Sequence, residues 1–563
     1  MRAASSRHTA PWACAAVLVA LSFGTLACER GSTQPVEEDE EATETGRYAH
    51  RKYGLWHIHQ GDIARAIEFC QPTGSNDSEN HFCLAVAHGQ LGNIQEAMRH
   101  VEQAVAAGAP AERFLAGPRE LLAPLTQSDA FRAWAEGRSV DLLHGPMVGA
   151  VTSASARFWV RTLHEVAVQI RVAPHSGEPG AVASETRATA AERDFTATLD
   201  VSGLRPDTLY DYDVLLDGRP VPRPVQPRFR TYPVADASTR FEVAFGGCAN
   251  YIPWNERMWD TIRARGPLAF IFLGDNTYFN IPDVLAHQRH FFYRRHARPE
   301  FRRMVASTAI YAIYDDHDFS GNDRFGGPEI ETPAWKRNVT WRAFRENFVN
   351  PYYGGGEAVP GVWTDFEVGD VHFILLDGRY YRTDPTGEHP TMLGPVQKQW
   401  LFETLAASTA SFKILASPVP FAPGRKRIDG GRDTWDGYPD EREEIFSFIE
   451  RNRIEGVFLI SGDRHRSDAW KIERTEGYDL YEASTAHLTK PGTHPLKPEA
   501  LFSHRGRPMY GVLGFDFTTA DPELRYTVID IDSERVDSLA LRRSQLSFSP
   551  EPPEGTAPEK PQG

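Results

Sequence analysis

Six short segments between residues 241 and 462 are almost wholly apolar, and most of them end at a glycine or an acidic residue. They read FEVAFGG, LAFIFLG, AIYAIYD, VHFILLD, FKILASP and GVFLISG. Apolar runs of this length predict strands that are buried on both faces, as in parallel sheets covered by helices. Helix candidates at 396–407 and 441–452 alternate with these strands, so residues 240–545 are predicted to form an α/β domain.

Chemically active side chains follow five of these segments. They are Cys248; Asp275 and Tyr278; Asp315, Asp316, His317 and Asn322; Asp377, Arg379 and Arg382; and Asp463 and His465. A lone acid at a strand end is more often a cap or a turn former. In open α/β sheets, however, ligands bind beyond the carboxyl ends of the strands. Five such ends that converge on one edge therefore predict a site rather than a set of caps.

The donor types in this set favour a two-metal site. Thiolate, phenolate, carboxylate and imidazole together suit a redox or Lewis-acid ion such as iron, whereas oxygen ligands alone suit calcium, magnesium or manganese. Asp275 would bridge the two ions, which clamp a phosphate and lower the pKa of a bridging water to supply hydroxide at neutral pH. Arg379 and Arg382 would bind the non-bridging phosphate oxygens. The sequence contains neither a P-loop nor a G-x-S-x-G motif, which counts against both of those hydrolase classes.

The two ends of the chain have the composition of a targeting segment and a tail. An apolar stretch too short for a membrane span predicts an export signal over residues 1–27. The following Cys-Glu-Arg resembles the acylation site of bacterial lipoproteins and implies a lipid anchor in a membrane on Cys28, although Thr25 stands where leucine is usual. An acidic linker is predicted at 28–46 and a disordered Pro-rich tail at 546–563. The expected location is the cell envelope, either periplasmic or on the outer surface.

Residues 47–138 are predicted to be helical. QGDIARAI at residue 60 and LGNIQEAM at residue 91 match in register and resemble tetratricopeptide repeats. Two such units bury little apolar surface by themselves, so further helices are expected to pack on them, including one that contains FRAW near residue 134. The repeats either bind a peptide partner or have a structural role alone. Cys70 and Cys83 are able to form a disulfide in an exported segment, and the sequence leaves that pairing open.

Residues 139–234 show the period-two alternation of a β-sandwich, with a strand pair that resembles the fibronectin type. The strand candidates are SARFWVRT, VAVQIRVA, FTATLDV, LYDYDVLLDG and PRFRTY. The formal net charge of -15 argues against a nucleic-acid binding module. The basic cluster at 289–303 is the main local exception, either a solvated helix face or a rim that attracts phosphate.

Several strings occur in an order that resembles one family. They are GGCAN, GDNTY, YDDHD, LDGRYYR, LGPVQKQWL, DTWDGYPDER and GDRH. Together they resemble the PhoD-type alkaline phosphatases of the calcineurin-like metallophosphatase superfamily, over residues 141–545. The resemblance implies a four-layer sandwich with two mixed sheets flanked by helices, preceded by a small β-sandwich. It also implies hydrolysis of phosphate monoesters and diesters.

The resemblance implies a role for each site residue. Cys248 and Tyr278 would bind iron (Fe³⁺), with Asp275 as the bridge; Asp316 and Asn322 would face calcium; Asp463 and His465 would complete the two shells. Magnesium, manganese or zinc are alternatives at the second site. His317 occupies the position of a general acid or transition-state stabiliser near the leaving group. The alternative is a histidine with no catalytic role, whose hydrogen bonds are made within the acidic loop.

The expected function is therefore metal-dependent hydrolysis of small-molecule or lipid phosphate esters at the cell envelope, for phosphate scavenging. One alternative is a phospholipid or cell-wall polymer phosphodiesterase. An alternative of another class is a repeat-bearing scaffold lipoprotein with a decayed catalytic domain, against which the intact ligand set argues. The chain departs from the family pattern in three ways: no twin-arginine signal, no histidine in ILASPVP, and a helical region ahead of the sandwich.

Overall fold

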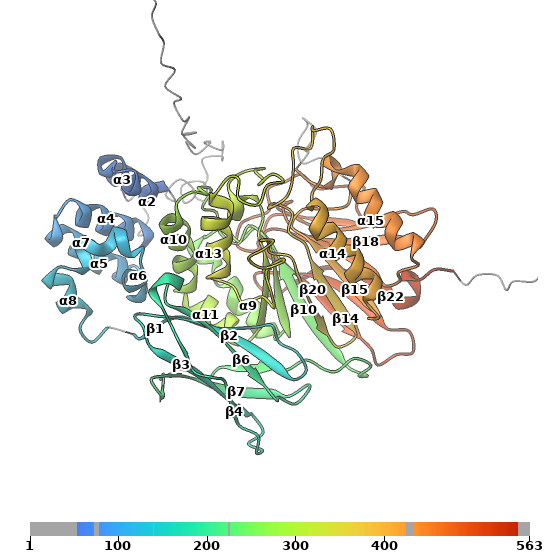
Figure 1. Cartoon of the computed structure of the whole chain (residues 1–563), viewed down its shortest axis with the longest axis horizontal. Helices are drawn as coiled ribbons and strands as arrows, with labels where there is room; N and C mark the ends of the chain where they lie inside the picture. The colour runs from blue at the N-terminus through green and yellow to red at the C-terminus, as the bar shows by residue number, and fades with distance from the viewer. Residues whose placement is uncertain (1–52, 72–77, 139, 223–225, 424–432, 550–563) are drawn as a thin grey trace, which may run out of the picture. The chain divides into compact units, whose positions relative to one another are not determined.

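The computed structural model describes residues 53–71, 78–138, 140–222, 226–423 and 433–549 (Figure 1). The predicted signal peptide, Cys28, the acidic linker and residues 550–563 of the predicted tail lie outside these residues. Within the described part of the chain, no helix combines the length and the apolar character needed to cross a bilayer.

The N-terminal region is helical, as predicted. Its helices are α2 (Gly54–His59), α3 (Ile63–Phe69), α4 (Ser78–Gln90), α5 (Ile94–Ala106), α6 (Glu112–Ala116), α7 (Arg119–Thr126) and α8 (Asp129–Ala135). The two similar strings occupy equivalent places, because α3 and α5 both begin at the isoleucine of the string. Phe131 of α8 shares a buried cluster with Phe82 and Val101, so later helices cover the two pairs as expected. A Cys70–Cys83 disulfide joins the end of α3 to α4.

The strands predicted for residues 139–234 are all present. They are β2 (Ser155–Thr162), β3 (Ala167–Pro174), β6 (Thr196–Ser202), β7 (Leu209–Leu216) and β9 (Arg228–Arg230). Four further strands in this region were not predicted: β1 (Leu142–Gly149), β4 (Val182–Ala183), β5 (Arg187–Ala188) and β8 (Arg219–Pro220). They do not form a self-contained sandwich, however. β1 pairs in parallel with β12 (Ala309–Ile313) of the following region, with Gly149 opposite Ile310. A Cβ at Gly149 would lie 2.6 Å from the Ile310 carbonyl oxygen, so the absent side chain permits this approach.

That pairing produces one nine-stranded sheet in the order β22-β21-β20-β10-β11-β12-β1-β2-β6. The remaining strands are β10 (Arg240–Gly246), β11 (Ala269–Leu273), β20 (Met509–Asp516), β21 (Glu523–Asp530) and β22 (Arg535–Arg542). β10, β11 and β12 run parallel at its centre. Every residue of β11 and β12 is buried, which explains their continuous apolar sequences.

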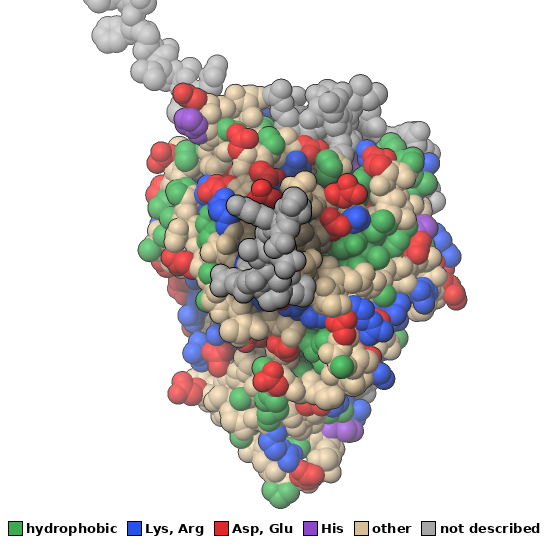
Figure 2. Space-filling model, turned by 90° about the vertical axis from the view of Figure 1, so that its right-hand side faces the viewer, with side chains coloured by type: hydrophobic (Ala, Val, Ile, Leu, Met, Phe, Trp, Pro, Cys, Tyr) green, Lys and Arg blue, Asp and Glu red, His purple; other side chains and the backbone are tan. Residues whose placement is uncertain are grey.

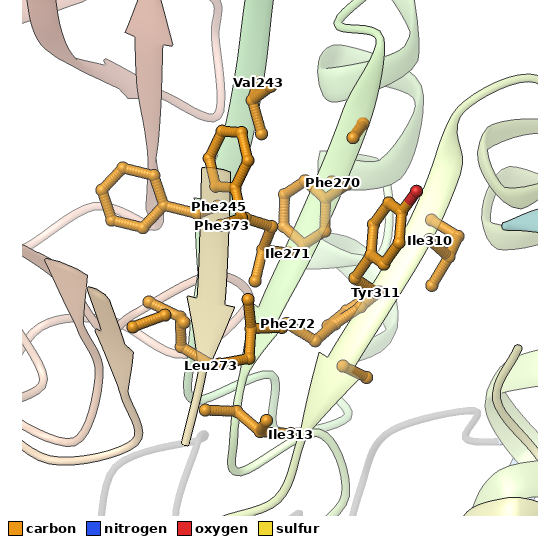
Figure 3. Close-up of a cluster of buried hydrophobic side chains, with 14 of the residues drawn as sticks. Val243, Phe245, Phe270, Ile271, Phe272, Leu273, Ile310, Tyr311, Ile313 and Phe373 are labelled. Atoms are coloured by element: carbon orange, nitrogen blue, oxygen red, sulfur yellow. The ribbon is translucent and has the colours of Figure 1, made fainter. Parts of the chain in front are cut away.

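A seven-stranded sheet has the order β13-β14-β15-β16-β18-β17-β19. Its strands are β13 (Thr364–Val368), β14 (Val371–Leu375), β15 (Phe412–Ser417), β16 (Val457–Ser461), β17 (Ser467–Ile472), β18 (Leu480–Thr485) and β19 (Phe502–His504). β14, β15, β16 and β18 run parallel. The apolar faces of the two large sheets contribute to one core, in which Phe373 of β14 lies among side chains of β10, β11 and β12 (Figure 3).

Helices accompany both sheets. The longer ones are α9 (Met258–Arg265), α10 (Leu285–His296), α11 (Pro299–Val305), α14 (Gly394–Ala407) and α15 (Pro439–Arg451); α12 (Asp316–Phe319), α13 (Arg342–Arg345) and a π-helical turn (Lys336–Trp341) are short. Trp259 of α9 lies 5.8 Å from Phe272 of β11, measured between ring centroids, and α14 meets α15 through the stacked rings of Phe402 and Phe448. Helices α14 and α15 agree with the predicted 396–407 and 441–452 to within two residues at each end.

Charged side chains of both signs, together with apolar ones, are interspersed on the face shown in Figure 2. The described residues of that face present no extended surface of positive charge. The basic cluster at 289–303 is also engaged, because Arg289 pairs with Glu346, Arg295 with Glu256 and Arg303 with Asp260. Arg289 and Arg295 are largely buried, so the cluster is not the solvated helix face that the sequence suggested, and its carboxylate partners also argue against a phosphate-attracting rim.

Candidate metal centre

The candidate site lies where strand ends of the two large sheets meet. Gly247, after β10, and Gly462, after β16, approach so closely that a Cβ at Gly247 would lie 3.5 Å from the Gly462 Cα. Gly274, after β11, has a φ of +98°, and a Cβ there would lie 2.5 Å from the Asp315 Cβ. Small residues at these three positions thus allow the loops that carry the predicted ligands to converge.

The first group of possible ligands contains Cys248, Asp275 and His465, whose ligand atoms lie within 4.8 Å of one another. The Cys248 Sγ is 3.5 Å from the Asp275 Oδ2 and 3.9 Å from the Asp463 backbone oxygen. Tyr278 shares a buried cluster with Cys248, and no described residue meets its buried hydroxyl with hydrogen-bond geometry. This group offers sulfur, nitrogen and oxygen donors, the mixture that suits iron or zinc.

Two further groups continue the first with harder donors. Asp275, Asp316 and His317 form the second group, and Asp316, Asp323 and Asp433 the third, each within the same 4.8 Å limit. Asp275 belongs to the first and second groups, and Asp316 to the second and third. The three groups therefore overlap: Asp275 is the carboxylate that the thiol-containing group shares with the second group.

Burial makes the protonated forms of these groups favourable while no cation is present. Burial and then the charges of Asp316 and Asp315 raise the pKa of Asp275 well above its usual value. Burial, followed by the charge of Asp275, raises the pKa of both the Cys248 thiol and the Tyr278 hydroxyl. A bound cation would reverse this preference by stabilising the anionic forms. The buried acids and the unmatched Tyr278 hydroxyl therefore fit a metal centre.

The backbone at the site is strained. Cys248, Asp275, Asp463 and His465 have φ values of +59°, +53°, +65° and +44°, in the left-handed region that non-glycine residues rarely occupy. Each such conformation costs of order 1–3 kcal/mol and persists only where the surroundings require it. Strain at four predicted ligands supports a functional origin for these turns.

His317 is held on both sides. Its Nδ1 lies 2.6 Å from the Asn280 Oδ1, and its ring lies 4.4 Å from the Tyr278 ring, measured between centroids. The Asn280 Nδ2 in turn donates to the Tyr53 hydroxyl at 3.3 Å. With the Asn280 oxygen facing the imidazole, His317 donates from Nδ1, which fixes the orientation of the ring.

The two predicted phosphate-binding arginines have carboxylate partners instead. The Arg379 Nε lies 2.6 Å from the Asp315 Oδ1, and both of its terminal nitrogens pair with Asp433 at 2.7 and 2.9 Å. Arg382 pairs with Asp433 at 3.0 Å and donates to the Tyr438 hydroxyl. These contacts make both arginines charge partners of the acidic cluster, and direct contact with a phosphate stays a prediction.

Several residues of the centre were not predicted. Asp323 and Asp433 join the carboxylate group; Asp323 directly follows the predicted Asn322, and Asp433 is the first residue of the quoted string DTWDGYPDER. Asn322, the predicted neighbour of Asp323, is half-buried in the same loop. Asp377, another strand-end acid, is a cap: it accepts from the backbone nitrogens of Arg379 and Tyr380 and from the Tyr314 hydroxyl.

Comparison with known families identifies two parts of the chain. Residues 243–500 match the family described as PhoD-like phosphatase, and residues 139–234 match a domain of unknown function (DUF7800). The curated alkaline phosphatase D of Bacillus subtilis (strain 168) is 29% identical over 204 residues, which cover 32% of this chain and 34% of that protein. The matched part thus spans about a third of that relative.

Two solved structures share the fold. The structure of PhoD superposes with a TM-score of 0.60 at 20% identity, covering 72% of this chain and 90% of that chain. The purple acid phosphatase PPD1 from yellow lupin (Lupinus luteus) seeds gives a TM-score of 0.54 at 11% identity, covering 74% and 78%. At these identities the likeness extends to the mixed α/β architecture.

Proposed function

We propose that this protein, which contains a PhoD-like phosphatase domain, is a metal-dependent phosphoric ester hydrolase that acts on phosphomonoesters, phosphodiesters or both. The observation that carries the proposal is the shared carboxylate. Asp275 belongs both to a group that includes Cys248 and to a group that includes Asp316, as a bridge between two cations requires. The family match and the curated relative independently support phosphate ester hydrolysis.

The residues divide into two candidate shells. Cys248, Tyr278, Asp275 and His465 would hold the softer cation, for which iron is the proposed ion; Asp275, Asp316, Asp323 and Asp433 would hold the harder one, for which calcium is proposed. Asn322, next to Asp323 in the chain, and Asp463, whose backbone oxygen lies 3.9 Å from the Cys248 Sγ, stay candidate ligands. When bound, such cations supply Lewis acidity that neutralises phosphate charge and acidifies water.

The remaining side chains position charge and protons. In the reaction a water oxygen adds to phosphorus as the bond from phosphorus to the leaving oxygen breaks. His317, oriented by Asn280, would give a proton from Nε2 to that leaving oxygen. Arg379 fixes Asp315 and Asp433, so that the carboxylates keep their positions when a substrate enters.

We further propose that the enzyme acts at the cell envelope on small-molecule or lipid phosphate esters. The Cys70–Cys83 disulfide supports an oxidising compartment, because structural disulfides are rare where thiols are kept reduced. The predicted lipid on Cys28 would hold the site near a membrane. The helical repeats remain a candidate surface for a peptide partner.

Replacement of Asp275 by Asn tests the proposed function. The purified protein is expected to hydrolyse an aryl phosphate monoester or its diester. Asp275→Asn is expected to lose bound metal and to reduce turnover at least a thousandfold. The reason is that a neutral amide cannot bridge two cations as a carboxylate does. Asp283→Asn is the matched control, since this acid is exposed and lies eight residues further on. Equal turnover by both variants would refute the assignment; no hydrolysis of either ester by the reconstituted wild type would favour a decayed scaffold.

A further inference from the structure

A separate group of metal-ligand side chains lies in the N-terminal helical region. His88 is near the end of α4, and Glu96 and His100 are one turn apart on α5. Their ligand atoms lie within 4.8 Å of one another, and the His100 Nε2 is 3.5 Å from the Glu96 Oε1. Residues four apart on a helix present their side chains on the same face, so Glu96 and His100 form a natural chelating pair for a ligand on α4.

The hydrogen bonds around His100 leave the correct nitrogen for a metal. Its Nδ1 lies 3.1 Å from the His81 Nδ1, and both rings are buried. When His100 donates from Nδ1, its Nε2 carries a lone pair on the side of Glu96, where an Arg99 nitrogen now lies. Metal-binding histidines usually donate their second ring nitrogen to a neighbouring acceptor in this way. The Nδ1 of His88 is also buried, with no hydrogen-bond partner among the described residues.

A positive group already occupies this place. The Arg99 guanidinium bonds to both carboxylate oxygens of Glu96, and one of its nitrogens lies 3.0 Å from the His100 Nε2. The Arg99 side chain is half exposed, so it is able to turn into solvent. Glu96 and His100 therefore already hold a positive group at this position, and Arg99 competes with any metal ion for it.

We propose that His88, Glu96 and His100 form a second metal site, suited to a divalent transition ion such as zinc and separate from the catalytic centre. Two imidazoles and one carboxylate are ligands that zinc accepts, with water in the fourth position. The ligands come from both helices of one pair, so the ion would link α4 to α5. Its expected role is structural stabilisation of the helical region.

The test measures zinc binding by the full chain, by equilibrium dialysis with elemental analysis. Glu96→Gln is the informative variant, because Glu96 is partly exposed and its loss should not unfold the protein. Glu102→Gln, an exposed acid on the same helix, is the matched control. Glu96→Gln is expected to lose one zinc equivalent, with hydrolysis of the aryl phosphate unchanged, whereas Glu102→Gln keeps it. Equal zinc content in both variants would overturn the proposal.

A second variant gives a change of opposite sign. Arg99→Ala removes the competing cation and is expected to lower the zinc dissociation constant about tenfold. If the three residues served only to hold the Arg99 ion pair and bound no metal, removal of Arg99 would not tighten zinc binding. Unchanged or weaker binding in Arg99→Ala would overturn the proposal. Measurement in an Asp275→Asn background separates this zinc from ions held by the catalytic centre.

Discussion

At the scale of single residues, Asn280 connects the site to the N-terminal helical region through hydrogen bonds. It has a left-handed backbone conformation with a φ of +56°, it accepts from His317 and it donates to Tyr53, the first described residue of the helical region. One amide thus joins the proposed proton donor to the region ahead of the sandwich. Asn280 is a positioning residue, since it acts through His317.

Substitution of Asn280 by Ala is expected to lower kcat about tenfold with little change in KM or in metal content. The imidazole would lose its hydrogen-bond partner at Nδ1 and rotate away from the leaving oxygen, while the ligands stay in place. Steady-state kinetics with an aryl phosphate, combined with elemental analysis, check this result. Asn322→Ala gives a useful contrast, because loss of a ligand would reduce metal content as well. An Asn280→Ala enzyme with wild-type kcat would remove Asn280 from the mechanism.

The sequence identified strand-end residues well, but it could not separate ligands from caps. Asp316 and Asp377 follow similar apolar strands, yet only Asp316 lies within a ligand group. The Asp377 carboxylate instead accepts hydrogen bonds from backbone nitrogens of its own turn. Asp433 could not be predicted from strand ends, because it lies far from one in sequence. Its position depends on the ion pair with Arg379, a contact between distant segments.

At the scale of elements, the disulfide between α3 and α4 fixes the first helix pair to the second. The half-cystines are buried within the core of the helical region, together with Leu55 and Ile58 of α2. Short helices of this length are marginal alone, and their stability comes from packing. The cross-link therefore adds a covalent constraint to helices that depend on packing.

A double replacement, Cys70→Ala with Cys83→Ala, is expected to lower the unfolding free energy of the helical region by about 3 kcal/mol, because a loop of this size is no longer closed in the unfolded state. Hydrogen exchange of α3 and α4 amides measures the effect locally. Amides of β11 in the catalytic region serve as the internal reference and should keep their protection. Equal protection of α3 in the variant and the wild type would contradict the prediction.

Apolar runs predicted the positions of β10, β11, β12, β14, β15 and β16 because residues buried on both faces leave little choice of side chain. The pairing of β1 with β12 was not predictable. It joins a strand of the supposed sandwich to the catalytic sheet through the contact of Gly149 with Ile310. Nothing local in either strand encodes that contact, and an independent sandwich is the simplest reading of the pattern alone.

At the scale of the whole molecule, buried histidines make stability depend on pH. Burial lowers the pKa of His487 to about 3, and it also lowers the pKa values of His144 and His296 well below their usual value. The pKa of a histidine in an unfolded chain is about 6.5. Below that pH the unfolded state binds protons that the folded state excludes, so stability is fully present above about 6.5 and falls as the pH decreases towards 3.

Each such histidine contributes up to about 1.4 kcal/mol per pH unit to this loss. His487→Gln removes one of them and retains a partner for the Ser467 hydroxyl, so its unfolding free energy should fall less steeply with acid than that of the wild type. Denaturant unfolding between pH 6.5 and 4 measures the slopes. His59→Gln, at an exposed position, should keep the wild-type slope. Identical slopes for His487→Gln and the wild type would contradict this account.

The most direct test of the central claim is elemental analysis of the purified protein beside Cys248→Ser, with monoester and diester turnover measured on the same samples. We expect iron and a harder second ion, calcium, in the active wild type, and loss of both iron and turnover in Cys248→Ser. Absence of bound metal and turnover after reconstitution, or iron content unaffected by Cys248→Ser, would contradict the assignment of the strand-end residues to a metal centre.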